Sequence, residues 1–177
     1  MSATVALVRD HQIILSGLEV LRLMGERMEV RQDVDREDIH VVLGFMRDVA
    51  HRCVDNTEGL IGPILASNAG ASRQVLETTL DNHRQVRTLF EQLTQAVESD
   101  AAGEFVSLSV SYTTLLADLI CEERRILPPL LGSASGATSI ENIQQFEANE
   151  REIREVSRRH GLILRRLETK YTSPHCI

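Results

Sequence analysis

The sequence predicts an all-α protein, built as an antiparallel up-down bundle of four helices with an additional long helix at the C-terminus. Apolar residues recur at spacings of three and four over long windows, which is the period of an amphipathic helix. Aromatic residues make up only 3% of the 177 residues, and Trp is absent. Together these observations favour helices over strands.

The first two helices follow from the stripe pattern and from one acidic start signal. The first should span about residues 5–30, with an apolar stripe that also carries His11. The second begins after Asp33 or Asp35, because an acidic N-cap followed by acidic residues in the first turn is a typical helix start. We expect this helix to end near the Gly-Pro pair at residues 62–63.

The third and fourth helices carry continuous apolar stripes that end at clear breaks. The third should run from residue 72 to residue 97, with His83 on its stripe, until the segment 99–103 interrupts it. The fourth begins near Phe105, carries Glu122 on its stripe, and should stop at Pro128–Pro129 because proline disrupts a helix interior.

A Gly/Ser/Ala-rich linker at residues 132–138 separates this core, about residues 5–131, from a last helix over about residues 139–171. Ser139 with Glu141 behind it forms the helix start. The last helix is highly charged and its apolar stripe is narrow, so we expect it to lie as a strut outside the four-helix core. The whole chain is predicted to form one domain with a sizeable core.

The overall charge bears on the partners of the protein. The formal net charge is −7, with 42% hydrophobic and 25% charged residues, which is typical of a soluble globular chain. Nucleic-acid and anionic-membrane binding require a clustered basic face, and the basic pairs at 158–159 and 165–166 are the only such cluster in the sequence. We therefore expect no nucleic acid and no membrane as partner.

Neither a leader nor a spanning segment is evident in the sequence. The start lacks a basic leader followed by a long apolar run, and no apolar stretch elsewhere approaches the length needed to span a bilayer. A cytoplasmic protein is the simplest interpretation. The three cysteines, Cys53, Cys121 and Cys176, contain no C-x-x-C pair, so we expect reduced thiols, the first two of them buried.

Several polar residues share the interior stripes. His11 lies on the first helix, Glu58 near the end of the second, His83 on the third, and Glu122 with Asp118 on the fourth. Bundle proteins build metal sites in this way, from rigid facing helices that each offer a carboxylate or an imidazole. An ionised carboxylate taken out of water must otherwise be paired or neutralised.

At these positions the chain resembles the hemerythrin-like (HHE cation-binding) proteins. The resemblance covers nearly the whole chain, including segments 146–150 and 167–171 of the last helix, which fit the tail of such proteins. It rests on the order and spacing of four short motifs across four helices: Asp10-His11, Glu58–Leu65, Asp81–Arg84 and Glu122–Pro128.

The resemblance implies a non-haem di-iron centre held by histidines from all four helices and by two bridging carboxylates. It sets His11 and His83 on the histidines of the first and third helices. It sets Glu58 and Glu122 on the two bridging glutamates. The implied partners are a metal ion and a small diatomic ligand or peroxide.

The chain departs from that family pattern at two positions. Val54 replaces the histidine that precedes Glu58, and Asp118 replaces the histidine that precedes Glu122. Asp118 presents oxygen to the same point as an imidazole, whereas Val54 cannot bind metal unless His51, one turn further back, swings in. An oxygen-rich set of this kind suits iron or manganese, and zinc also fits. The candidate metal ligands are therefore His11, Glu58, His83, Asp118 and Glu122.

Three functions are consistent with these residues. The first and favoured one is a hemerythrin-like metal-binding protein, not an enzyme, that holds one or two non-haem iron ions and senses or handles oxygen, nitric oxide or peroxide. The second is a peroxide-consuming di-metal enzyme. The third is a metal-free bundle whose polar residues form a buried network, and which acts as a structural or regulatory module through the charged last helix or a homodimer. No catalytic residue is assigned.

Overall fold

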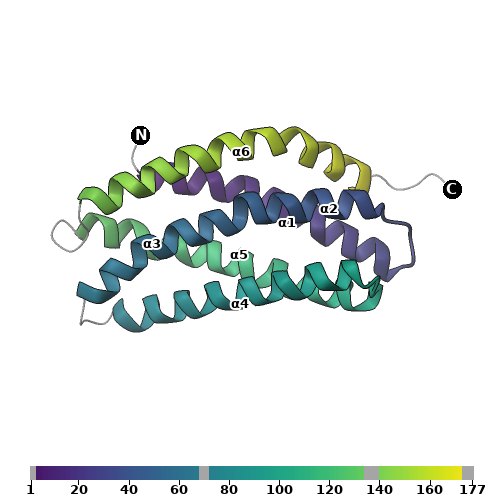
Figure 1. The fold of residues 1–177 in the computed structure, drawn as a ribbon, viewed down its shortest axis with the longest axis horizontal. Coiled ribbons are helices and arrows are strands. Elements are labelled where there is room, and N and C mark those ends of the chain that lie inside the picture. The colour runs from purple at the N-terminus through teal and green to yellow at the C-terminus, as the bar shows by residue number, and fades with distance from the viewer. Residues whose placement is uncertain (1–2, 68–71, 134–139, 173–177) are drawn as a thin grey trace.

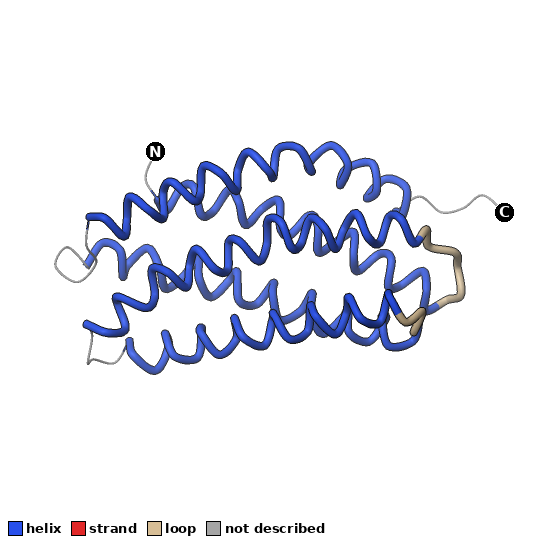
Figure 2. Tube along the Cα trace, viewed as in Figure 1, coloured by secondary structure: helices blue, strands red, loops and turns tan. Residues whose placement is uncertain are grey.

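A computed structural model of the chain describes residues 3–67, 72–133 and 140–172. The described backbone is helical except for two short loops at one end of the bundle (Figure 2). The elements are α1 (Ala3–Glu29), α2 (Arg36–Phe45), the π-helical turn η1 (Met46–His51), α3 (Arg52–Ser67), α4 (Ser72–Glu98), α5 (Ala102–Ser133) and α6 (Ile140–Thr172). The predicted all-α fold class is confirmed.

The core is a bundle of four rods. α2, η1 and α3 follow one another without a break and form a single rod, and the other three rods are α1, α4 and α5. α1 packs against α5 and α6, α4 packs against α5, and α3 packs against α4 and α6. α6 lies along the outer edge, with α1 and α3 between it and α4 (Figure 1). The predicted additional C-terminal helix is therefore present on the outside of the four-rod core.

The helix boundaries agree with the sequence at some ends and differ at others. Asp35 is the N-cap of α2, and its side chain accepts a hydrogen bond from the backbone N–H of Glu37 at 2.9 Å. The predicted stops at residues 62–63 and 128–129 are wrong, because α3 continues to Ser67 and α5 to Ser133. Each proline lies in the last two turns of its helix, so only a short helical segment follows the backbone hydrogen bond that it cannot donate.

The apolar core forms two clusters along the bundle. The larger cluster draws on all four rods and on α6. The smaller cluster consists of Leu60, Ile61, Ile64, Leu76, Leu127 and Phe146. Along α3, α4 and α5, each helix passes from one cluster to the other, so a boundary layer crosses the interior of the bundle.

One helix is long and apolar enough to cross a membrane by length and composition, namely α5 over Ala102–Pro129. The expectation that no such segment occurs is therefore wrong on this criterion. The core helix of a bundle has the same composition, because its interior face is apolar throughout. α5 packs against both α1 and α4 and buries a stripe that includes Phe105, Tyr112, Leu116 and Leu127.

The C-terminal end of α6 is tied to α1 and α2. The Tyr171 hydroxyl donates to Asp38 Oδ2 at 2.7 Å and accepts from the backbone N–H of Asp35 at 3.2 Å. Arg27 Nε donates to the carbonyl of Tyr171 at 3.0 Å. Partial burial raises the pKa of Asp38, but hydrogen bonds from Lys170 and Tyr171 outweigh this effect, so the pKa of this carboxyl lies below its usual value.

The substitution Asp38→Asn is expected to lower the free energy of unfolding at pH 7 by about 1 kcal/mol, because charge-assisted hydrogen bonds are lost. A lowered folded-state pKa gives stability that is present above about pH 4 and is lost as the pH falls through that lowered pKa. Urea unfolding measured from pH 7 to pH 2 should therefore show that the free energies of unfolding of the wild type and the variant converge in acid. Asp33→Asn, in the exposed loop, is the control. If Asp38→Asn lowered the free energy of unfolding equally at every pH, this would contradict the lowered pKa of Asp38.

Candidate metal centre

Three buried polar side chains from three helices meet inside the bundle. Glu123 on α5 lies between His11 on α1 and His83 on α4. Glu123 Oε2 is 3.2 Å from His11 Nε2, and Glu123 Oε1 is 3.0 Å from His83 Nε2. All three residues are at most 2% exposed. One carboxylate therefore contacts two imidazoles in the buried interior of the bundle.

The triad of His11, His83 and Glu123 occupies the boundary between the two apolar clusters. On α5, Glu123 lies between Ile120 of the larger cluster and Leu127 of the smaller one. On α4, His83 lies between Leu76 and Val86, which belong to different clusters. These polar residues continue the apolar stripes of their helices at three- and four-residue spacing, which explains why the folded chain buries them.

The hydrogen bonds around Glu123 favour the negatively charged form of its carboxylate. Burial raises the pKa of Glu123, but the hydrogen bonds and charges of His11 and His83 outweigh it, so the pKa lies below its usual value. Arg124 Nε lies 3.4 Å from His11 Nδ1 and can donate to it. This contact favours the tautomer in which His11 Nε2 carries the proton and donates it to Glu123.

Two further polar atoms near this layer lack hydrogen-bond partners among the described residues. They are His83 Nδ1 and Thr57 Oγ1. His83 is 0% and Thr57 1% exposed. Buried polar groups are nearly always hydrogen-bonded. Buried polar atoms without a partner are therefore a feature of sites that accept a small ligand or water.

The structure brings together only two of the five predicted ligands, His11 and His83. Asp118 is exposed. The Glu122 side chain is 25% exposed and lies 3.9 Å from Arg125, so the interior position predicted for Glu122 belongs to its neighbour Glu123. The reason is helical phase, because adjacent residues point about 100° apart on a helix.

Glu58 also lies away from the triad. Arg87 on α4 forms an ion pair with Glu58 and another with Asp55, at 2.6 Å from Asp55 Oδ1. The interior position of this turn is held by Thr57. Continuing the apolar stripe from Cys53 by four residues leads to Thr57 and not to Glu58, so this signal was present in the sequence.

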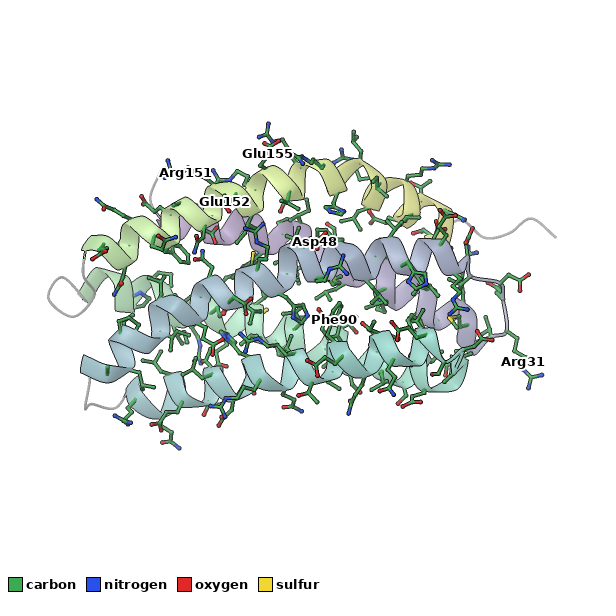
Figure 3. All side chains as sticks on the ribbon, viewed as in Figure 1. Arg31, Asp48, Phe90, Arg151, Glu152 and Glu155 are labelled. Atoms are coloured by element: carbon green, nitrogen blue, oxygen red, sulfur yellow. The ribbon has the colours of Figure 1, made fainter. Side chains whose placement is uncertain are left out.

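His51 does not join the triad. Its Nε2 lies 3.2 Å from the Tyr112 hydroxyl, and its ring packs on Phe90 at 4.3 Å between centroids. Burial lowers the pKa of His51 to about 4, so this ring is neutral, and it shares a hydrogen bond with the Tyr112 hydroxyl. Phe90 extends from α4 toward the rod of α2, η1 and α3 (Figure 3). This aromatic group was not predicted from the sequence.

The cysteines lie outside the triad. Cys53 is buried, as predicted, whereas Cys121 is exposed, so the prediction for Cys121 is wrong. Cys121 lies between Ile120 and Glu122, off the buried stripe of α5. Cys176 lies outside the described residues.

The triad combines two imidazoles and one carboxylate, which are side chains of the kind that bind metal ions, and in this structure hydrogen bonds join them. In residues 3–67, 72–133 and 140–172, no group of three or more His, Cys, Asp or Glu side chains is arranged as it stands to hold a metal. A two-ion centre does not fit, since Glu58 and Asp118 lie elsewhere.

The comparison with protein families identifies the class. The model of the hemerythrin HHE cation binding domain matches residues 2–131, which is most of the chain and comprises the four rods without α6. The chain belongs to this family. No curated protein and no solved structure matched it.

Proposed function

We propose that this protein binds a single non-haem iron ion through His11, His83 and Glu123. The observation that carries the proposal is the meeting of two imidazoles and one carboxylate from three rigid helices in a buried layer. Two histidines and one carboxylate are the set that holds non-haem Fe(II) while leaving positions free for a small ligand. Oxygen, nitric oxide and peroxide are ligands of the right size for such a site.

The proposal of one ion instead of two rests on the surroundings of the triad. Glu58 is held by Arg87, and Val54 and Leu119 fill interior positions one turn before Glu58 and Glu123 with apolar side chains. A pair of ions needs more donors than three. Arg124 Nε donates to His11 Nδ1 in this structure, whereas a ligand histidine usually donates from its other ring nitrogen, so the proposal requires this contact to change when His11 Nε2 binds the ion.

Elemental analysis tests this proposal. The untagged protein, purified and also reconstituted anaerobically with Fe(II), should contain about one ion per chain. Glu123→Gln should lose the metal, because the amide cannot replace the anionic donor, while Glu122→Gln should retain it. Circular dichroism shows whether each variant folds. Two ions per chain, no metal in the folded wild type after reconstitution, or equal metal in both variants would contradict the proposal.

A second candidate function is a metal-free structural or regulatory module. The observation that favours it is that Glu123 already receives a hydrogen bond from each histidine, so the carboxylate is satisfied without an ion. Metal that binds the folded state raises the melting temperature as its free concentration rises. A melting temperature that neither Fe(II), Mn(II) nor a chelator changes would support the metal-free module.

A further inference from the structure

The outward face of α6 carries opposite charges in its two halves. This face points away from the bundle, as Arg151 and Glu155 show in Figure 3. Glu141, Glu147, Glu152 and Glu155 are exposed in the N-terminal half. Arg158, Arg159, Arg165, Arg166 and Lys170 are exposed in the C-terminal half. Arg151 is also exposed in the N-terminal half, so the helix presents a predominantly acidic segment followed by a basic one along the outer edge of the molecule.

Several of these charges have no ion-pair partner in the described part of the chain. Glu141 and Glu147 form no ion pair there, and neither do Arg165 and Arg166. By contrast, Arg158 lies 2.5 Å from Glu155. The two ends of the face thus carry charge of opposite sign that is available to a partner, while its middle is partly neutralised.

The same face exposes two large apolar side chains. Leu162 is 71% and Ile163 45% exposed. Among the described residues, the other exposed large apolar side chains, Val30, Val75 and Val110, are isolated in the sequence. Adjacent exposed apolar residues rimmed by charged ones are characteristic of protein interaction sites.

We propose that this face binds the α6 helix of a second copy of this chain in an antiparallel pair. A two-fold axis brings the same patch of both subunits together, so the patch must be complementary to itself. An antiparallel pair centred near Glu155 and Val156 meets this condition. It sets Glu147 opposite Arg165 and Arg166 of the second copy, and each such contact occurs twice.

The remaining charges follow the same alignment. Glu152 falls opposite Arg158 and Arg159 of the second copy, and Glu141 falls opposite Lys170. Ile163 falls opposite Ala148, next to Asn149. The two Glu155 carboxylates approach each other at the centre, where each is already held by its own Arg158 and Arg159, the latter at 3.6 Å.

The acidic half of α6 favours a second copy over an anionic partner. A nucleic acid or an anionic membrane attracted by Arg165 and Arg166 would be repelled by Glu141, Glu147 and Glu152 when it lies along the same helix. A second copy in antiparallel orientation turns that repulsion into attraction. The proposed pairing uses none of the triad residues, because all of its contacts lie on α6.

The energetics predict a weak, salt-sensitive dimer. The 33 residues of α6 correspond to a helix about 50 Å long, but exposed ion pairs contribute little individually. We expect a dissociation constant of roughly micromolar size, at the weak end for interfaces between folded proteins. Because salt screens exposed charges, the constant should rise about tenfold or more between low and high ionic strength.

Sedimentation equilibrium of charge-reversed variants tests the pairing. Arg165→Glu with Arg166→Glu places acidic residues opposite Glu147 of the second copy, and Glu147→Arg places a basic residue opposite Arg165 and Arg166. Each variant alone should be monomeric at concentrations where the wild type is a dimer. An equimolar mixture of the two should dimerise again, because each half then meets its opposite. This recovery also shows that both variants fold.

The control variant carries the same change of charge on another helix. Arg73→Glu with Arg84→Glu reverses two exposed arginines of α4 and should leave the dimer intact. A wild type that stays monomeric up to about 1 mM, far above the expected constant, would overturn the proposal. So would α6 variants that remain dimeric alone, or a mixture that remains monomeric.

Discussion

Glu123→Ala is expected to lower the free energy of unfolding of the metal-free protein by about 3–5 kcal/mol, the range for breaking one side of a buried charged pair. The substitution removes the acceptor of two hydrogen bonds and leaves His11 and His83 without it at 1% and 0% exposure. It also leaves a cavity between the two apolar clusters. Chemical denaturation in the presence of a chelator measures the effect.

Glu122→Ala is the matched control for this substitution. Glu122 is the adjacent residue of the same helix, but its side chain is 25% exposed and it pairs with Arg125 at 3.9 Å. Its removal should change the free energy of unfolding by less than about 1 kcal/mol. Equal losses in the two variants, or a larger loss at Glu122, would mean that the helical phase of α5 differs from the one described.

Gly17→Val is expected to destabilise the fold by about 3 kcal/mol or more, at the upper end for overpacking a close-packed core. A Cβ atom at Gly17 would lie 2.8 Å from Phe45 Cδ1 and 2.9 Å from Met46 Cε. Both neighbours are 0% exposed, and the Phe45 ring is rigid, so a side chain at Gly17 would force the ring to shift within the close-packed core. α1 therefore requires a residue without a side chain where it meets the end of α2 and the start of η1.

Gly59→Val provides the control for this prediction. Nothing lies within 4 Å of a Cβ at Gly59, and this residue is exposed on α3. Valine has a better helix propensity than glycine, so the free energy of unfolding should stay level or rise by a few tenths of a kcal/mol. Thermal and urea unfolding measure both variants, and a Gly17→Val protein as stable as the Gly59→Val protein would contradict the packing described for α1.

The fold was predictable because its signal is distributed over many residues. Each helix has several turns of apolar residues at regular spacing, so errors at single positions do not change the outcome. The end at Ser133 was missed because Pro128–Pro129 is a typical stop signal, whereas α5 continues to Ser133. The π-helical turn η1 was also missed, since one extra residue per turn leaves no distinct pattern in a single sequence.

The site was predictable only in part, because a ligand set depends on single positions. His11 and His83 were placed correctly in the interior. Glu122 was placed on the predicted interior stripe and in the family motif, although the buried stripe of Tyr112, Leu116 and Ile120 continues to Glu123. A one-residue error moves a side chain by about 100° around the helix and so from the interior to the surface.

Contacts between residues far apart in the sequence could not be predicted from the sequence. The pairing of His51 with Tyr112 joins residues 61 positions apart, and the ion pair of Arg87 with Glu58 joins two helices. Periodicity indicates which face of a helix is buried, but it does not indicate which residues of two helices meet at the same level.

Anomalous diffraction from crystals of the protein loaded with Fe(II) under anaerobic conditions tests the proposed metal centre most directly. We expect one iron peak per chain, bounded by His11, His83 and Glu123. Two peaks in the interior would contradict the single-ion centre. A single peak beside Glu58, Asp118 or Glu122, or no peak in fully reconstituted crystals, would contradict the assignment of the triad as the metal site.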